Sequence, residues 1–304
     1  MEKMNAAVVT SFDEPPHYET FDVPTTRGGE IVVDVVAVGL HPRTRSGAAG
    51  RHYTSTGQLP MIPGIDGVGR RADGQLVYFV ADDDVIGTMA EKAVVDPRRT
   101  IELPAGADAA RVAAAMNPAM SSWVALRRRV PIQPGQSVLV LGAAGNAGSM
   151  AMQVAKLLGA GEVIGAARRA GDGLLALDEV GKAAEAGIVL DYLWGEPAQK
   201  AIVEILTNRS DRSRLLDWVQ IGSVAGPTIE LPSVALRSAN FRLQGNGQGA
   251  VSPRAYLAEL PSLIDEIGRG TIEIAPRPVP LSSVTDAWAH QDAPGERTVL
   301  VTGR

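Results

Sequence analysis

The sequence of 304 residues contains no cysteine. Disulfide bonds, thiolate catalysis and every zinc site built on cysteine are therefore excluded. Only four histidines are present, and they show no paired ligand spacing, so we expect no metal. The longest apolar runs, Ile31–Leu40 and Val138–Gly145, are too short to span a bilayer. The N-terminus lacks the apolar core of a signal peptide, and we expect a cytoplasmic protein.

Excess positive charge is also lacking. The net charge is −5, which argues against a nucleic-acid partner, because phosphate binding needs a concentrated basic surface. The densest basic run, Arg127-Arg128-Arg129, is interpreted as the C-terminal end of a helix, where cations are favourable. Hydrophobic content of 45% and charged content of 21% are typical of a globular protein, and the length suffices for two domains.

The pattern of apolar residues, proline and glycine changes along the chain. Residues up to about 115 are rich in β-branched runs broken by proline and glycine, such as "EIVVDVVAVGL". From about Val130, apolar strands alternate with helical patterns, which predicts a doubly wound parallel sheet. The last forty or so residues return to strands and turns. We predict domains at 1–118 and 119–260, with 261–304 returning to the first domain.

One stretch does not fit a doubly wound sheet. Between the strands "EVIGAA" and "GIVLDYL" such a sheet holds a helix, a strand and a second helix. Residues 168–186 have room for a helix and a fragment, with no convincing strand. Either this lobe is shortened or residues are missing from the sequence, and we favour the second explanation.

A small, uncharged turn, "LGAAGNAGSM", joins the apolar run "SVLV" to a helical pattern. Glycines at a strand-to-helix turn let the backbone approach a pyrophosphate, and the helix N-terminus supplies N–H donors. The alternative is a tight turn with close helix–sheet packing. Because a strand, a helix and a second strand flank the turn, we predict a dinucleotide site here. Its candidate residues are Gly142, Ala144, Gly145, Asn146, Ala147 and Gly148.

The end of the second strand, "GAARR", indicates which dinucleotide is bound. An acidic residue there would bind a free ribose 2′-hydroxyl, whereas Arg168 and Arg169 suit a 2′-phosphate. The alternative is that both arginines are solvated surface residues. The predicted cofactor is NADPH.

Taken together, these features resemble the medium-chain dehydrogenase/reductase superfamily, and most closely its zinc-independent quinone oxidoreductase branch. The motifs that carry the resemblance are "IPGIDGVG", "GTMAEKAVV" and "PGQSVLVLGAAG". The resemblance implies an α/β protein with a Rossmann doubly wound parallel sheet and a GroES-like β-barrel domain. It further implies an active site in the cleft between the domains, and a homodimer. The uncovered edge of the last strand, "NFRLQGNGQ", is a candidate dimer contact.

The chain departs from the family at the position of a zinc-ligating cysteine, where it has Leu40-His41. Quinone reductases commonly have Asn-Pro there, and this chain has His41-Pro42. Without a metal, the substrate carbonyl still needs a polarising or proton-donating group. The candidates are His41, His52 and Tyr53, with loop anchoring or a turn as the alternative roles.

Other segments match the family where it contacts the nicotinamide half of the cofactor. The segment "AMNPAMSSWVAL" supplies Asn117, Ser121 and Ser122, for which helix capping is the alternative. Two later strands end in "QIGSVAG" and "LQGNGQG", which supply Gly222, Ser223 and Asn246. We predict an NADPH-dependent, zinc-independent reductase of a quinone or conjugated carbonyl. A zinc-free alcohol dehydrogenase, an enoyl reductase and a non-catalytic NADPH sensor remain alternatives.

Overall fold

The computed structural model describes residues 2–81 and 85–303. These residues form two compact units: one comprises Met1–Asn117 and Ile264–Arg304, the other Pro118–Leu263. Two helices cross the boundary between the units, α2 (Ala109–Val124) and α7 (Leu260–Arg269). None of the helices in the described ranges is long and apolar enough to cross a membrane.

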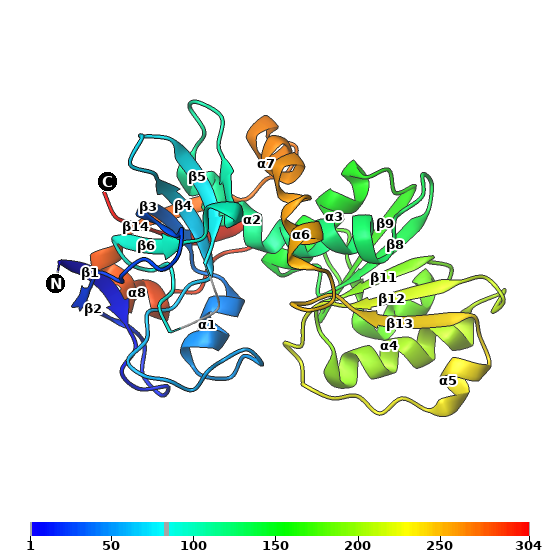
Figure 1. Ribbon diagram of the computed structural model, residues 1–304. Helices are drawn as coiled ribbons and strands as arrows, with labels where there is room; N and C mark the ends of the chain where they lie inside the picture. The colour runs from blue at the N-terminus through cyan, green and yellow to red at the C-terminus, as the bar shows by residue number, and fades with distance from the viewer. Residues whose placement is uncertain (1, 82–84, 304) are drawn as a thin grey trace. The chain divides into compact units, whose positions relative to one another are not determined.

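The second unit is built on a six-stranded parallel sheet with the order β10-β9-β8-β11-β12-β13 (Figure 1). This is the 3-2-1-4-5-6 order of dinucleotide-binding folds, so the predicted Rossmann sheet is confirmed. Its strands are β8 (Ser137–Leu141), β9 (Glu162–Ala167), β10 (Leu175–Ala176), β11 (Ile188–Asp191), β12 (Leu216–Gln220) and β13 (Phe241–Gly245).

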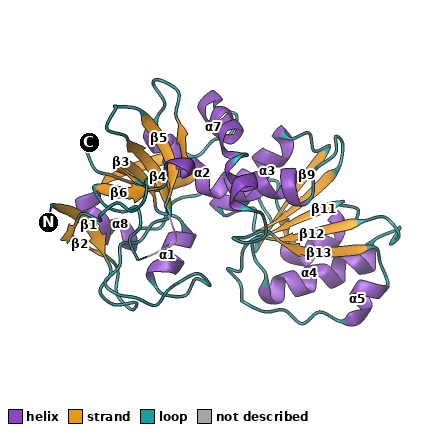
Figure 2. Cartoon of the chain, in the orientation of Figure 1, coloured by secondary structure: helices purple, strands orange, loops and turns teal. Residues whose placement is uncertain are grey.

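Helices cover both faces of this sheet, with α3 on one side and α4 on the other (Figures 1 and 2). The helical segments of the unit are η2 (Ala125–Arg129, a π-helix), α3 (Asn146–Leu157), η3 (Leu177–Ala183), α4 (Gly195–Asn208), α5 (Ser233–Arg237) and α6 (Pro253–Leu257). Its buried apolar core includes Leu139, Leu141, Ile202, Ile205 and Trp218. The strands β8 and β11 are almost wholly buried, as continuous apolar runs in a covered parallel sheet should be.

The stretch after β9 folds as a short lobe in place of the expected helix, strand and helix, and the explanation by missing residues stays a prediction. After β9 the chain turns through residues 168–174 and forms β10, a two-residue strand that pairs parallel to β9. The 3-10 helix η3 then leads directly toward β11. Two residues are too few to show any hydrophobic period, which is why no strand was predicted there.

The first unit contains a seven-stranded, mostly antiparallel sheet in the order β14-β15-β3-β4-β5-β7, with β6 paired to β3, and a two-stranded sheet of β1 and β2. Its elements are β1 (Lys3–Val8), β2 (His17–Asp22), β3 (Ile31–Gly39), α1 (Pro42–Ala48), β4 (Asp66–Arg70), β5 (Leu76–Val80), β6 (Lys92–Val95), η1 (Pro97–Arg99), β7 (Thr100–Glu102), β14 (Ala275–Pro280), η4 (Leu281–Ser283), α8 (Val284–Ala289) and β15 (Glu296–Val301). The C-terminal strand β15 pairs antiparallel with β3, which brings the end of the chain into the N-terminal sheet.

Candidate dinucleotide site and comparisons

The glycine turn between β8 and α3 gives each of its three glycines a different role. Gly142 has φ +87°, a conformation that favours glycine, and turns the chain out of β8. A Cβ on Gly148 would lie 2.3 Å from the carbonyl oxygen of Gly142, so α3 packs directly on the turn. Gly145 is exposed, and a Cβ there would meet only the Gly142 carbonyl oxygen at 3.4 Å. The three glycines thus serve the turn, the close packing and the open approach that a pyrophosphate requires.

The N-terminus of α3 is suited to an anion. Its N-cap is Gly145, which has no side chain to cap the helix, and no acidic residue lies in the first turn. Ala144 is exposed beside it, and Asn146 and Ala147 are the first two residues of the helix. Phosphate binds at such N-termini because of the orphan N–H groups and the positive end of the helix dipole.

Arg168 and Arg169 follow β9 and are exposed. Neither guanidinium makes a hydrogen bond or an ion pair with another described residue, so both are free to meet a ligand. Arg168 also lines a surface pocket of about 610 Å³, formed with the start of η3 and one side of α4. Leu177, Pro197 and Val203 give this pocket apolar walls.

The other predicted residues of this unit gather where β11, β12 and β13 end. The Tyr192 hydroxyl lies 2.9 Å from Ser121 Oγ, and Asn246 Nδ2 donates to the Ser121 carbonyl at 2.8 Å. A Cβ on Gly222 would lie 2.6 Å from the Tyr192 carbonyl oxygen. Ser122 is buried and donates to the Ala119 carbonyl. The structure therefore brings together Ser121, Ser122, Gly222 and Asn246, residues that are far apart in the sequence.

Two predicted residues lie near this group without a described side-chain contact to it. Ser223 follows Gly222, is exposed, and accepts from the Gly226 backbone N–H. Asn117 lies one helical turn before Ser121 in α2 and is the last residue of the first segment of its compact unit. Their predicted role as cofactor contacts stays a prediction.

The sequence analysis missed Asp191, the last residue of β11. This buried carboxylate accepts from the Leu193 and Trp194 backbone N–H groups and from Trp218 Nε1. It stabilises a turn in which Trp194 has φ +53°, a strained conformation for a bulky residue. Burial raises the pKa of Asp191, and these three hydrogen bonds oppose that rise. A carboxylate at the end of a buried strand was the available signal.

In the first unit, His41 is buried and caps α1. Its Nε2 lies 3.0 Å from Asp66 Oδ1, and its Nδ1 lies 3.4 Å from the Thr44 backbone nitrogen. With Asp66 as the acceptor, Nε2 carries a proton and Nδ1 accepts from Thr44. The second oxygen of Asp66 accepts from the Tyr78 hydroxyl at 2.8 Å. His41, Asp66 and Tyr78 thus form a buried network, of which sequence analysis singled out only the histidine.

The other two catalytic candidates lie in the loop after α1. His52 Nδ1 lies 2.8 Å from Thr54 Oγ1, and Arg43 donates to the same hydroxyl. The Tyr53 ring contacts the His52 ring at a centroid distance of 4.2 Å and is 70% exposed. The partners of His41 are Asp66 and Thr44, so the structure places His41 in a different hydrogen-bonded group from His52 and Tyr53.

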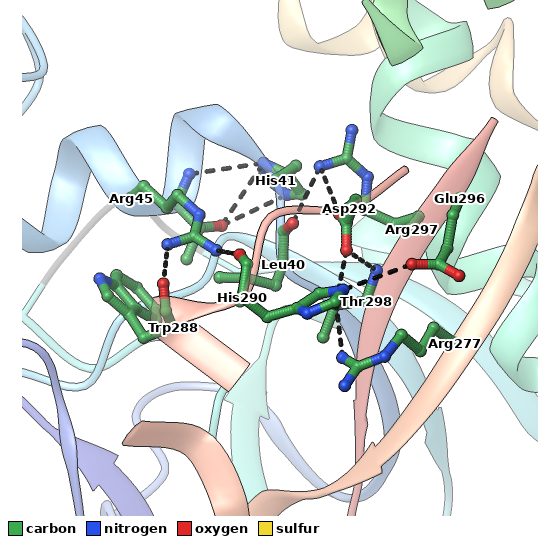
Figure 3. A network of polar contacts seen from close by, with 11 residues as sticks. Leu40, His41, Arg45, Arg277, Trp288, His290, Asp292, Glu296, Arg297 and Thr298 are labelled. Atoms are coloured by element: carbon green, nitrogen blue, oxygen red, sulfur yellow. Dashed lines mark hydrogen bonds and ion pairs between the residues drawn. The ribbon is translucent and has the colours of Figure 1, made fainter. Parts of the chain in front are cut away.

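The C-terminal segment of the chain holds α1 and the turn before it (Figure 3). Arg45 in α1 donates to the carbonyls of Trp288 and His290, and its guanidinium lies over the Trp288 ring. The buried Arg297 donates to the Leu40 carbonyl at 2.9 Å, directly before His41. These contacts fix the position of His41 from the far end of the sequence.

Within the same segment, His290, Asp292 and Glu296 have potential metal-ligand atoms within 4.8 Å of one another. These atoms already have partners: His290 Nε2 faces Glu296 Oε1 at 3.4 Å, and Asp292 accepts from Thr298 and lies 3.6 Å from Arg297. The arginine compensates the negative charge that would attract a cation. The cluster is therefore explained as an internal network, and the absence of a metal stays a prediction.

The basic run at the end of α2 is also explained internally. Arg127 and Arg128 each pair with one oxygen of the buried Glu259, and Arg129 donates to the carbonyls of Gly245 and Ala250. Burial raises the pKa of Glu259, and the two arginines outweigh that effect, so the net pKa is lowered. The three arginines therefore have structural partners within their own unit.

The strand order and the glycine turn are those of a dinucleotide-binding fold, and comparisons with known proteins agree. No family model matches the chain. A probable NADPH-dependent quinone reductase of Emericella nidulans is 29% identical over 364 residues, covering 98% of this chain and 100% of that protein. The NADPH-dependent alkenal/one oxidoreductase of Arabidopsis thaliana is 25% identical and covers 88% of this chain and 70% of its own length.

Among solved structures, the quinone oxidoreductase of Thermus thermophilus, studied also in complex with NADPH, superposes with a TM-score of 0.80. It is 24% identical and covers 98% of this chain and 100% of its own. The chain is therefore similar over nearly its whole length to a quinone reductase in sequence and to a quinone oxidoreductase in fold, in agreement with the resemblance to the quinone oxidoreductase branch of the medium-chain dehydrogenase/reductase superfamily. The predicted combination of a Rossmann sheet with a GroES-like domain is confirmed by this likeness.

Proposed function

We propose that this protein is an NADPH-dependent, zinc-independent oxidoreductase that reduces a quinone or a conjugated carbonyl. The observation that carries the proposal is the glycine turn, in which Gly145 is exposed, together with two exposed arginines after the neighbouring strand. The relatives described as NADPH-dependent quinone and alkenal/one reductases support the same cofactor and substrate class.

In this proposal, different residues at the ends of the strands bind different parts of the cofactor. The turn from Gly142 to Gly148 and the first turn of α3 bind the pyrophosphate, while Arg168 and Arg169 bind the 2′-phosphate. Ser121, Ser122, Gly222, Ser223 and Asn246 orient the nicotinamide half, to which Asn117 also contributes. Bound NADPH supplies a hydride to the electrophilic carbon of the substrate.

The proposed proton donors are residues of the first unit. Tyr53 is exposed and can donate a hydrogen bond to the oxygen on which negative charge develops. His52, with Nδ1 accepting from Thr54, has its proton on Nε2 in the neutral form and can assist. His41 is buried with both ring nitrogens engaged, so its proposed role is to fix α1 and the start of this loop.

The test is NADPH oxidation on a panel of quinones, enones and simple aldehydes, with NADPH affinity measured alongside. Turnover of quinones or enones supports the proposal. Turnover confined to simple aldehydes or alcohols indicates an alcohol dehydrogenase, and tight binding without turnover on any acceptor indicates a sensor.

We expect a preference for NADPH over NADH that depends on the two exposed arginines. A guanidinium binds a phosphate through two parallel hydrogen bonds, each worth roughly 1.5–3 kcal/mol. One good contact therefore gives about a 10- to 100-fold preference, nearer the lower value at an exposed site. The measurement is the ratio of kcat/KM for the two cofactors in wild type and in the double variant Arg168→Ala/Arg169→Ala. Equal use of both cofactors by wild type, or an unchanged preference in the variant, contradicts the assignment.

We also propose a cytoplasmic homodimer. β13 forms an edge of the parallel sheet and has no partner on its outer side among the described residues. Such an edge invites pairing with a symmetry mate. Exposed apolar side chains lie close by in the chain, with Val234 at 56% and Leu236 at 51%.

Light scattering at micromolar concentration is expected to give twice the chain mass of 31.9 kDa. The variant Leu236→Lys, which adds charge to the exposed apolar surface, is expected to shift the distribution toward monomer. A wild-type mass equal to that of one chain would contradict the dimer.

A further inference from the structure

The Tyr192 side chain is buried just after the carboxyl end of β11 and makes polar contacts with α2, which is distant in the sequence. Its hydroxyl lies 2.9 Å from Ser121 Oγ in α2. Ser121 donates its own proton to the Pro118 carbonyl at 2.9 Å, so Ser121 Oγ accepts the proton of Tyr192. Burial raises the pKa of Tyr192 to about 12, against the effect of hydrogen bonds to Ser121 and Ser122, so the phenol remains a donor at neutral pH.

A second residue holds Ser121 from another strand. Asn246, which follows β13, donates from Nδ2 to the Ser121 carbonyl at 2.8 Å. The Asn246 backbone N–H is itself fixed by the Gln220 carbonyl at the end of β12. The side chain and the backbone of Ser121 are therefore anchored separately, by residues after β11 and β13.

The helix needs such anchoring because it is irregular on both sides of Ser121. Pro118 lies inside α2 and cannot donate the helical hydrogen bond that other residues make. Directly after α2 the chain widens into the π-helix η2, from Ala125 to Arg129. π-helical turns are rare and occur often at functional sites. Regular helical hydrogen bonding therefore does not by itself determine where the Ser121 hydroxyl lies.

The strand order indicates which half of a bound dinucleotide would lie beside Ser121. With the pyrophosphate on the turn after β8, the adenosine half extends toward β9 and the other half toward β11, β12 and β13. A Cβ on Gly142 would lie 3.4 Å from Tyr192 Cβ, so Tyr192 adjoins the glycine turn on the side away from Arg168.

We propose that Tyr192 is a positioning residue for the nicotinamide half of the cofactor. Its hydroxyl holds Ser121 at the edge of the sheet and makes no contact with the cofactor itself. The proposal rests on the proposed function, because it assumes that NADPH binds across this edge.

The experiment compares two ligands, NADPH and adenosine 2′,5′-bisphosphate, which contains only the adenosine half. For Tyr192→Phe we expect NADPH to bind about three- to tenfold more weakly, the equivalent of one hydrogen bond, with the affinity for the bisphosphate unchanged. Ser121→Ala is expected to give a similar loss. The double variant should lose little more than either single variant, because both remove the same contact.

Ser137→Ala serves as the matched control, since it removes a hydroxyl at the opposite end of the same sheet. It should change neither affinity. If wild type binds neither ligand, the result contradicts both the proposed function and this inference. If wild type binds both, the inference alone is overturned by a Tyr192→Phe variant that weakens both ligands equally or neither. Losses that add fully in the double variant overturn it as well.

Discussion

Gly148→Ala is expected to abolish NADPH binding and to destabilise the parallel-sheet unit. The new Cβ would lie 2.3 Å from the Gly142 carbonyl oxygen and 2.8 Å from the Ala143 Cα, distances that no real Cβ tolerates. Both neighbours are backbone atoms, so α3 has to move away from the turn after β8. We expect the free energy of unfolding to fall by about 3 kcal/mol, the upper end of the usual cost of overpacking. NADPH affinity should fall at least about 100-fold, because the N–H donors move with the helix.

Gly145→Ala is the matched variant, three residues earlier in the same turn. Gly145 has φ −81° and ψ 157°, which any residue adopts, and its Cβ would make only an ordinary contact at 3.4 Å. The free energy of unfolding should change by no more than about 0.5 kcal/mol. NADPH affinity should still fall about tenfold, because the methyl group fills space that the pyrophosphate needs. Chemical denaturation and NADPH titration measure both quantities. A stable, fully binding Gly148→Ala variant would contradict the role assigned to the turn.

The glycine turn was predictable because local sequence alone specifies it. A buried strand, small residues and a helical pattern follow one another within a short segment, and each has its own signature. The Rossmann sheet followed from the same alternation of strands and helices. The strand β10 was not predictable, because two residues carry no period and its place beside β9 depends on tertiary pairing.

The polar networks escaped prediction for a different reason. Asp66 lies in the motif "IPGIDGVG", but its hydrogen bonds to His41 and Tyr78 join two strands to the N-cap of α1. The spacing of these residues along the chain does not predict such contacts. Tyr192 is buried, and its hydroxyl contact with Ser121 depends on how α2 packs on the sheet. Local pattern identifies elements and cofactor turns, whereas these partners are set by packing.

Asp66→Ala is expected to destabilise the first unit strongly and to stop turnover while leaving adenosine binding intact. The substitution removes the acceptor of two buried donors, His41 Nε2 and the Tyr78 hydroxyl. A buried donor left without a partner costs about 1–3 kcal/mol, so the free energy of unfolding should fall by about 4 kcal/mol in total. His41 also loses the contact that orients its ring, so the cap of α1 and the following loop with Tyr53 are no longer fixed.

Adenosine 2′,5′-bisphosphate provides the test that separates the two units. The residues assigned to the adenosine half, Arg168 and Arg169 among them, all lie in Pro118–Leu263, whereas Asp66 lies in the other unit. The affinity for the bisphosphate should therefore be unchanged in Asp66→Ala at a temperature where that unit stays folded. Tyr78→Phe removes one of the two donors together with its need for an acceptor, and Asp66→Ala/Tyr78→Phe should be less destabilised than the sum of the single variants. Full quinone or enone turnover by Asp66→Ala would show that the buried network does not support the reaction, and strictly additive losses of stability would show that Tyr78 and Asp66 do not act as a pair.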